Sequence, residues 1–441
     1  MIKAIRIVLI ITMLEVAYVA VIASYLFPWL GLALGAGLLI ALSRKRQTFS
    51  AFGRARWADP SDIPHMIRAG QGLVLGHIEG KPGKWSGIKA FFDRGLSSWQ
   101  AVTRYLESCQ RKATRHLVRL NTAAHVWMFA SAGIGKGVSC VIPHLLTCMW
   151  SCVVIDFKGE LAKLTAAARR RMGHKVVILD PYHVVTDNPD TYNVFDFIDS
   201  DSDLAIDDCR DVAESLVVRT GQEKEPFWLD AAESWLTAMS AMLVHLKPQV
   251  TANLAELKTL VSDTTLREQA ITRMIESDAW DEVLSRLGLA LTHSKDKELN
   301  STLTSTLRHL RFVDSPAVAD STRTSSFNPA ELVSGKMTIY LVLPPDRMRS
   351  EAGLLRLWIS SLFRAVIRCG LQETHKVNFI LDEASSLPKM DSIDDAIDQY
   401  RGYGIRLFLY YQSLGQLKKC FPDDQGQTLL SNTTQVFFGT N

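Results

Sequence analysis

A stretch of small residues around Lys136 carries the residue types best suited to chemistry on phosphate groups. It follows an apolar run at 126–129 and consists of Ser131, Ala132, Gly133, Ile134, Gly135, Lys136, Gly137, Val138 and Ser139. Glycines let backbone N–H groups approach an anion, and a helix N-terminus adds partial positive charge. Since a lysine at this position reaches the β- and γ-phosphates, the order of strand, glycine loop, lysine and helix predicts a phosphate-binding loop for ATP.

The loop departs from the pattern G-x-x-x-x-G-K-[ST] at two positions. Ala130 stands at the first glycine, and Gly137 follows the lysine where Ser or Thr normally supplies a hydroxyl to Mg²⁺. We expect Ser139 or a water molecule to replace that hydroxyl. For this stretch alone, a strand-to-helix turn that binds nothing is the alternative.

Asp382 and Glu383 follow a second apolar run, at 377–381, which is typical of a buried strand. A carboxylate at the end of a strand beside the phosphate loop suits Mg²⁺, so Asp382 is the predicted metal ligand. Glu383 suits the base that orients and deprotonates the attacking water. A solvated pair of strand-end carboxylates is the alternative, but the two motifs together favour binding of ATP and Mg²⁺.

Gln412 and Arg401 flank a third apolar run, at 405–411. A glutamine at a strand end beside Asp382 suits a sensor of the γ-phosphate and the attacking water. Arg401, in the sequence RGYG, is a candidate for an arginine supplied across a subunit boundary. Surface hydrogen bonding is the alternative for both side chains.

The elements that must position these residues alternate between strands and helices. Further apolar runs at 151–155, 176–179, 337–343 and 435–438 are typical of buried strands, which predicts an α/β fold with a parallel, doubly wound sheet. Asp156, Asp180 and Asp382 end three of these runs, so their carboxylates should lie along the edge where such sheets bind ligands. Helical spacing dominates residues 185–325, which predicts an all-α insertion between two parts of the nucleotide-binding core, 122–184 and 326–441.

Residues 7–43 are almost continuously apolar, with interruptions at Glu15 and Pro28. One helix of this length exceeds a membrane core of about 30 Å, so two spans with a turn near Pro28 are expected. Basic residues at both outer ends place both ends in the cytoplasm. The sequence therefore predicts a transmembrane hairpin at 1–46, with a cleaved signal peptide as the alternative.

A membrane-proximal connector with short strands is expected at 47–121. Its basic residues are predicted to form a solvated helix face, with a lipid or nucleic-acid patch as the alternative; they are Arg94, Arg104, Arg111, Lys112, Arg115 and Arg119.

Length and composition fit a folded chain of two or three domains with a membrane portion. The chain has 441 residues, 47% of them apolar, and a net charge of +3, which does not by itself mark a nucleic-acid binder. Its seven cysteines include no CxxC pair, and no histidine cluster has zinc spacing. We therefore expect reduced, structural cysteines and a cytosolic compartment.

Eight sequence motifs occur along the chain: AHVWMFASAGIGKGVSCVIPHLL, VVIDFKGEL, EPFW, FNPAEL, IYLVLPPD, LDEASSL, RGYGIRLFLYYQSLGQL and LLSNTTQVFFGTN. Together they resemble the type IV secretion and conjugation coupling proteins of the TraG/TraD type, over roughly residues 50–441. This resemblance implies a RecA-like, multi-pass ATPase that forms hexamers at the bacterial inner membrane, with the ATPase portion in the cytoplasm. It also implies that the α-helical insertion reads the substrate, and that relaxase-bound single-stranded DNA or protein effectors pass to the components of a secretion channel.

The resemblance assigns phosphate contacts to Gly133, Gly135, Lys136 and Gly137, since the family's own loop often contains G-K-G. It assigns Mg²⁺ to Asp382, water activation to Glu383 and γ-phosphate sensing to Gln412. The chain departs from the family at Ala132, often Thr, and at Ile134, often a small residue, and it stops at Asn441, where members usually continue. Two alternatives remain: a DNA translocase like FtsK or HerA, and a docking platform that binds nucleotide without hydrolysing it.

Overall fold

The computed structural model describes residues 15, 18, 72–79, 100, 102–103, 115–120, 124–131, 135–219, 225–247, 249–293, 296–387, 390–421 and 425–438. The chain divides into two compact units, Met1–Asp59 and Pro60–Asn441. Apart from Glu15 and Tyr18, both helical, the predicted transmembrane hairpin lies outside the described residues. Over the described ranges, no helix combines the length and the apolar character needed to cross a membrane.

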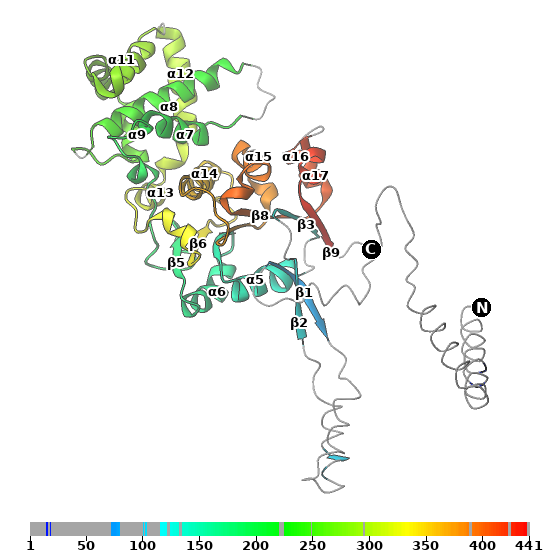
Figure 1. Ribbon diagram of the computed structural model, residues 1–441. Coiled ribbons are helices and arrows are strands. Elements are labelled where there is room, and N and C mark those ends of the chain that lie inside the picture. The colour runs from blue at the N-terminus through cyan, green and yellow to red at the C-terminus, as the bar shows by residue number, and fades with distance from the viewer. Residues whose placement is uncertain are drawn as a thin grey trace, which may run out of the picture. The chain divides into compact units, whose positions relative to one another are not determined.

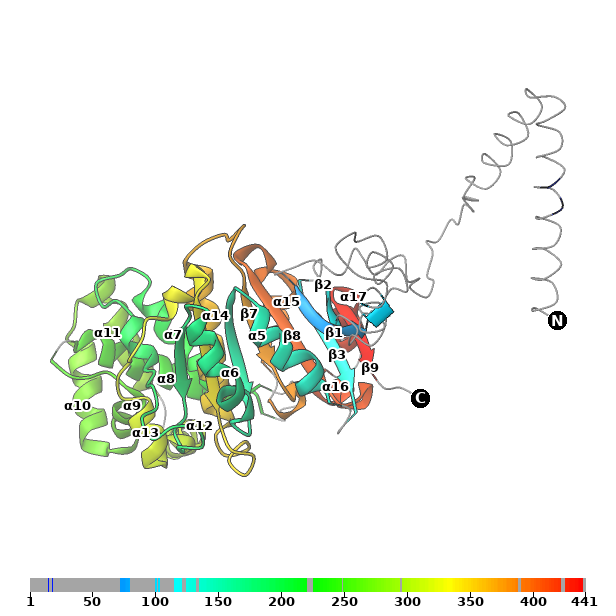
Figure 2. The same cartoon turned by 90° about the horizontal axis from the view of Figure 1, so that it is seen from below.

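A sheet of seven strands forms the centre of the second unit (Figures 1 and 2). Every neighbouring pair in it is parallel, which confirms the predicted α/β fold. The strand order is β5-β6-β4-β7-β8-β3-β9. The strands are β3 (Val126–Ala130), β4 (Ser151–Asp156), β5 (Lys175–Leu179), β6 (Met337–Val342), β7 (Val377–Leu381), β8 (Ile405–Tyr411) and β9 (Thr434–Phe438).

Helices cover both faces of this sheet, which explains why its central strands are buried along their whole length and mostly apolar. On one face, Val126 and Met128 share a core with the π-helical turn η2 (Gly137–Val141), α5 (Ile142–Thr147) and α6 (Glu160–Arg171). On the other face, Trp127 and Phe129 share a core with α14 (Ala352–Arg368) and α15 (Asp391–Asp398). Successive side chains of β3 thus point to opposite faces, as a strand requires.

The described chain between β5 and β6 contains helices and no strand. They are η3 (Val194–Phe197), α7 (Ala205–Leu216), α8 (Phe227–His245), α9 (Leu254–Ser262), α10 (Thr264–Ile275), α11 (Ala279–Leu291), α12 (Asp296–His309), η4 (Arg311–Asp314), α13 (Pro316–Ser321) and η5 (Pro329–Ser334). The segment 185–325, for which helical spacing predicted an all-α structure, contains α7 to α13. The limits of the insertion stay a prediction, because α7 also packs on α14 of the core.

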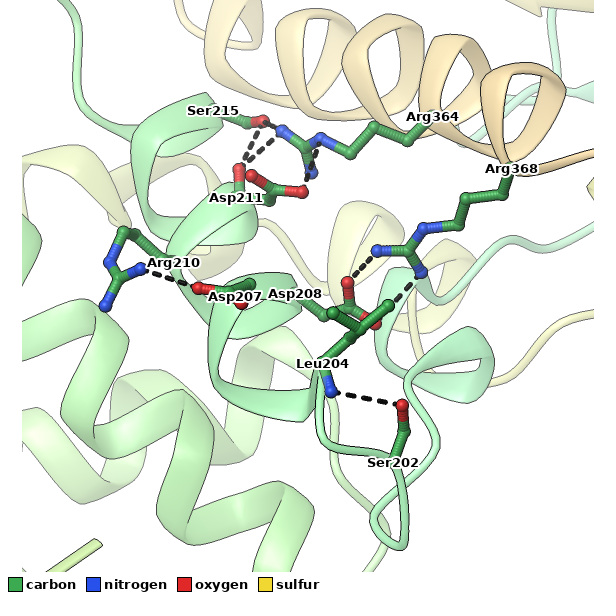
Figure 3. A network of polar contacts seen from close by, with 9 residues as sticks. All are labelled: Ser202, Leu204, Asp207, Asp208, Arg210, Asp211, Ser215, Arg364 and Arg368. Carbon is green, nitrogen blue, oxygen red and sulfur yellow. Dashed lines mark hydrogen bonds and ion pairs between the residues drawn. The ribbon is translucent and has the colours of Figure 1, made fainter. Parts of the chain in front are cut away.

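Charged side chains fasten α7 to α14 (Figure 3). Arg364 lies with its Nε 3.2 Å from Asp211 Oδ2, and it donates to Ser215 Oγ at 2.6 Å. One turn further along α14, Arg368 donates to Asp208 Oδ2 at 2.9 Å. These contacts hold α7 directly against α14, and they involve no side chain of α8 to α13.

An antiparallel pair of strands precedes the sheet in the chain, and it shows that one prediction was wrong. β1 (Leu73–Glu79) pairs antiparallel with β2 (Arg115–Leu120), so Arg115 and Arg119 lie on a strand rather than on a helix. Arg119 is buried instead of solvated, and it donates to the Gly72 carbonyl at 3.2 Å and to Thr147 Oγ1 at 2.6 Å. Its side chain contacts Thr147 of α5, because β1 packs on η2 and α5. The other basic residues of the predicted face lie outside the described residues.

The remaining described elements surround the last strands. They are the 3₁₀ turns η6 (Ala384–Ser386) and η7 (Tyr400–Tyr403) and the helices α16 (Leu414–Cys420) and α17 (Gln425–Ser431).

Candidate nucleotide-binding site

The centre of the candidate site is an ion pair between Lys136 and Asp382. Lys136 Nζ lies 2.9 Å from Asp382 Oδ1, and the two side chains are only 15% and 25% exposed. The partners come from different parts of the core: Lys136 directly precedes η2, and Asp382 directly follows β7. The structure therefore brings together the predicted phosphate-binding lysine and the predicted magnesium carboxylate.

The strand order explains this approach. β8 lies between β3 and β7, with Phe129 opposite Tyr411 and Leu381 opposite Leu409. All three strands are parallel, so their carboxyl ends meet at one edge of the sheet. Gln412 directly follows β8, the strand that lies between β3 and the strand preceding Asp382.

Gly135 and Gly137 have different structural roles in the loop. Gly135 has a φ of +86°, in the left-handed region that favours glycine, and its carbonyl accepts the Ser139 N–H at 2.8 Å. A Cβ built on Gly137 would meet no atom within 4 Å, so the structure has room there for the missing hydroxyl. Ser131 is exposed, whereas Ala132, Gly133 and Ile134 lie outside the described residues.

The helix after the loop starts with a π-helical turn. The Ile142 N–H donates to the Gly137 carbonyl, five residues back, and regular α-helix begins at Ile142. Pro143 follows at once; it has no N–H and therefore cannot continue the i to i−4 pattern. The change of hydrogen-bonding pattern thus coincides with Pro143, and Val138 and Ser139 in the π-helical turn are exposed next to the loop.

Glu383 adopts a left-handed backbone, with φ 58° and ψ 50°. This conformation costs a non-glycine residue about 1–2 kcal/mol, and such residues concentrate at functional sites. Glu383 is the N-cap of η6, and the chain leaves the direction of β7 at this residue. Glu383 therefore directly follows Asp382, the predicted metal ligand, at a position that the backbone holds at an energetic cost.

Gln416 holds the backbone beside Gln412, a contact that sequence reasoning missed. The Gln412 N–H donates to Gln416 Oε1 at 2.8 Å, while Ser413 Oγ accepts the Gln416 N–H at 3.4 Å as the N-cap of α16. The sequence contains a pattern that could have predicted this contact: Ser413 and Gln416 form S-x-x-Q, the pattern of a helix capping box. Gln416 is consequently a positioning residue for the predicted sensor.

Asp156 and Asp180 end their strands at the expected edge but bind their own turns. Asp156 Oδ2 accepts the Ala162 N–H at 2.8 Å, and burial raises the pKa of Asp156 despite such hydrogen bonds. The carboxylate of Asp180 accepts three backbone N–H groups, from Val184, Val185 and Thr186. Of the three strand-end aspartates, Asp382 alone pairs with the lysine of the loop.

Arg401 lies beside the amino-terminal ends of the strands, opposite the carboxyl ends that Asp382 and Gln412 follow. It belongs to η7, just before β8, and is exposed, whereas Gln412 comes after β8. A strand of seven residues spans roughly 23 Å. Arg401 consequently does not join Lys136 and Asp382 within one chain, and its predicted role concerns a neighbouring subunit only.

Comparisons with known proteins identify the family of this chain. The family model described as "Type IV secretory system Conjugative DNA transfer" matches residues 57–441. The "Type IV secretion system-coupling protein VirD4" of Bartonella quintana (strain Toulouse) is 27% identical over 308 residues, 68% of this chain and 48% of that protein. The "Conjugal transfer protein TraG" of Escherichia coli is 25% identical over 388 residues, 83% of this chain and 58% of that protein. The chain spans about half the length of such curated relatives.

Solved structures show the same fold. The coupling protein TrwBdeltaN70, in a trigonal form with sulphate, superposes with a TM-score of 0.60 at 17% identity, over 89% of this chain and 80% of that one. TrwB in complex with the ATP analogue ADPNP gives a TM-score of 0.59 at 17% identity, over 88% and 79%. With a family model that matches most of its length, this chain belongs to the type IV secretory system conjugative DNA transfer family.

Proposed function

We propose that this chain is the ATPase of a coupling protein, which uses ATP hydrolysis to deliver substrates to a type IV secretion channel. The observation that carries the proposal is the ion pair of Lys136 with Asp382, with Gln412 directly after the intervening strand. An ammonium group, a helix start and a carboxylate oxygen in one place fit the phosphates and the magnesium ion of Mg-ATP. A TrwB structure contains ADP and Mg²⁺, which supports the same ligands here.

The residues of the chain divide the chemistry among them. Lys136 turns from Asp382 to the β- and γ-phosphates, and Asp382 holds Mg²⁺, directly or through water. Mg²⁺ supplies charge neutralisation at the phosphates. Glu383 orients the attacking water and accepts its proton, while Gln412 donates a hydrogen bond toward the γ-phosphate.

We further propose a homo-hexamer at the bacterial inner membrane, anchored by the N-terminal hairpin. In such a ring, Arg401 at the far edge of the sheet reaches the nucleotide of a neighbouring subunit. The helical segment between β5 and β6 reads the cargo, which is relaxase-bound single-stranded DNA, an effector protein or both. The relatives' names, a coupling protein and a conjugal transfer protein, support this assignment.

The testing experiment measures ATP hydrolysis and binding of a fluorescent ATP analogue by the full chain in detergent, with and without single-stranded DNA. Lys136→Ala should abolish both activities, whereas Lys158→Ala, an exposed lysine beyond the next strand, should change neither. Stimulation by DNA supports the DNA cargo. Binding without turnover in the wild-type protein would establish a docking platform instead, and wild-type activity in Lys136→Ala would refute the site.

A further inference from the structure

A second group of chemically active side chains lies at the far end of the helix that begins at the phosphate loop. His144 belongs to α5, Cys148 caps its C-terminus, and Cys152 belongs to the neighbouring strand β4. One ligand atom from each residue lies within 4.8 Å of the others. All three residues are buried: His144 and Cys148 are 1% exposed, and Cys152 is 0% exposed. Imidazole and thiol groups in such an arrangement are the donor set of a soft metal ion.

The environment of His144 is unusual for a structural histidine. Its ring packs edge-on against Phe408, with the ring centroids 5.4 Å apart. Outside the cluster, neither ring nitrogen makes a hydrogen bond with a residue that the structure describes; within it, the ring contacts the sulfur of Cys152. Burying a polar group without a partner is costly, so buried imidazoles normally find one. The polar atoms of the cluster within reach of His144 are the two sulfur atoms, and an ion bound between the three side chains would be a stronger partner for the imidazole than a thiol.

Each sulfur atom accepts a hydrogen bond from a side-chain nitrogen. Asn378 Nδ2 lies 3.2 Å from Cys148 Sγ, and Arg169 Nη2 lies 3.6 Å from Cys152 Sγ. Arg169 is completely buried. Its other hydrogen bonds go to neutral acceptors: the carbonyls of Leu145, Cys148 and Trp150, the Thr338 hydroxyl and His174 Nδ1. The thiolate of Cys152 is therefore the one hydrogen-bond partner of Arg169, among these contacts, that can balance its charge.

We propose that His144, Cys148 and Cys152 form a binding site for a monovalent thiophilic cation, Cu⁺. Thiolate ligands select Cu⁺ and Zn²⁺, and imidazole suits both metals. The charge count decides between them. Two thiolates carry −2 and Arg169 carries +1, so one monovalent cation makes the buried group neutral. Zn²⁺ would leave a net +1 in an apolar core, which is costly.

Binding at this site requires no change of oxidation state. The ion enters as Cu⁺ and leaves as Cu⁺, each thiol that is still protonated releases its proton to solvent, and each sulfur donates an electron pair to the metal. The bound ion would join the end of α5 to β4, which is the neighbour of β7 in the sheet. It should therefore stiffen the support of the phosphate loop without contacting the nucleotide, and the inference does not rest on the proposed ATPase activity.

The test measures metal content and affinity in the full chain. The wild-type protein is produced in medium supplemented with copper or with zinc, so that the ion can enter during folding, and it is purified without oxygen. Mass spectrometry should find about one copper per chain, and a competing Cu⁺ chelator should measure the affinity. The double variant Cys148→Ser/Cys152→Ser should lose the metal, whereas Cys369→Ser, at an exposed cysteine, should keep it.

His144→Phe provides a second variant that retains both sulfur atoms and an aromatic ring against Phe408. It should bind Cu⁺ at least about tenfold more weakly, since one of three ligands is lost. In the wild-type protein, Cu⁺ should raise the melting temperature, and X-ray absorption should report sulfur and nitrogen neighbours. Equal copper content in the wild-type protein and the double variant would overturn the proposal. So would zinc in place of copper, or a Cys148–Cys152 disulfide in metal-free protein.

Discussion

Lys136 Nζ and Asp382 Oδ1 lie 2.9 Å apart, although the two residues come from the two separate parts of the core. Each is predicted to bind a different component of Mg-ATP, the lysine a phosphate and the aspartate the metal ion. The pair therefore keeps both side chains at the site and neutralises both charges. Since both groups are largely shielded from solvent, the loss of either partner should affect stability as well as binding.

Lys136→Ala and Asp382→Ala should each lower the free energy of unfolding by about 1–3 kcal/mol, because each leaves a partly buried charge without its partner. The double variant should lose less than the sum of the two, since no lone charge remains. Denaturant unfolding of the four proteins gives the coupling energy. Strict additivity would show that the ion pair contributes nothing to stability.

Glu383→Gln should keep nucleotide binding and reduce hydrolysis about 10²-fold or more, because a general base is removed. Glu383→Gly removes the same carboxylate but relaxes the left-handed backbone, so it should lose hydrolysis without a lower melting temperature. Steady-state hydrolysis and thermal unfolding of both variants separate the chemical effect from the conformational one. Normal turnover in Glu383→Gln would exclude this residue as the base.

Gly137→Ser should fold with an unchanged melting temperature, since a Cβ there meets no atom within 4 Å. By restoring the hydroxyl of the usual phosphate loop, it should tighten magnesium-dependent ATP binding. Gly135→Ser is the matched control; it should cost about 1 kcal/mol or more, because its φ of +86° is unfavourable for serine. A melting temperature lowered equally by both substitutions would contradict the different roles of the two glycines.

Gln416→Ala should lower kcat more than it weakens nucleotide binding, since Gln416 Oε1 holds the backbone N–H of Gln412 and not a ligand. Gln416→Glu keeps an acceptor oxygen at this position and should recover most of the activity. The ratio of kcat to nucleotide affinity in the two variants is the measurement. A purely structural role would lower the melting temperature of Gln416→Ala and leave kcat of the folded protein unchanged.

His125 should make the protein sensitive to mild acid. Burial, and then the charges of Arg401 and Arg406, lower the pKa of His125 to about 4, and its Nδ1 accepts the Leu407 N–H at 3.2 Å. An unfolded histidine has a pKa near 6.5, so between these values the unfolded chain binds the proton and the folded chain does not. Stability is therefore complete above about pH 7 and falls as the pH drops, by roughly 2 kcal/mol at pH 5 for this residue.

The measurement is the melting temperature of wild-type protein and His125→Gln between pH 7.5 and pH 5. The variant should lose less stability over this range than the wild-type protein. His309, whose pKa burial also lowers to about 4, should give a separate contribution that His309→Gln removes. An identical pH dependence in all three proteins would refute the assignment.

Local sequence determined the identity of most elements, because the spacing of apolar residues reports directly which faces are buried. The run at 405–411 became β8 with the same limits, and the helical pattern of 185–325 became the segment that contains α7 to α13. The positions of Lys136, Asp382, Glu383 and Gln412 beside strand ends also followed from these runs. What these motifs bind stays a prediction, as do the roles of Ala132, Gly133 and Ile134.

Tertiary structure alone decided which of these residues meet. The strand order β7-β8-β3 brings Asp382 to Lys136, and the pattern of a single strand contains no information about its neighbours. For the same reason Arg119 was placed wrongly, since its burial depends on packing against α5. The grouping of His144 with Cys148 and Cys152 was not predicted, because a helix end and a strand start face each other only after the chain turns between them. Local periodicity records burial, whereas contacts between distant segments depend on how the whole sheet and its helices pack.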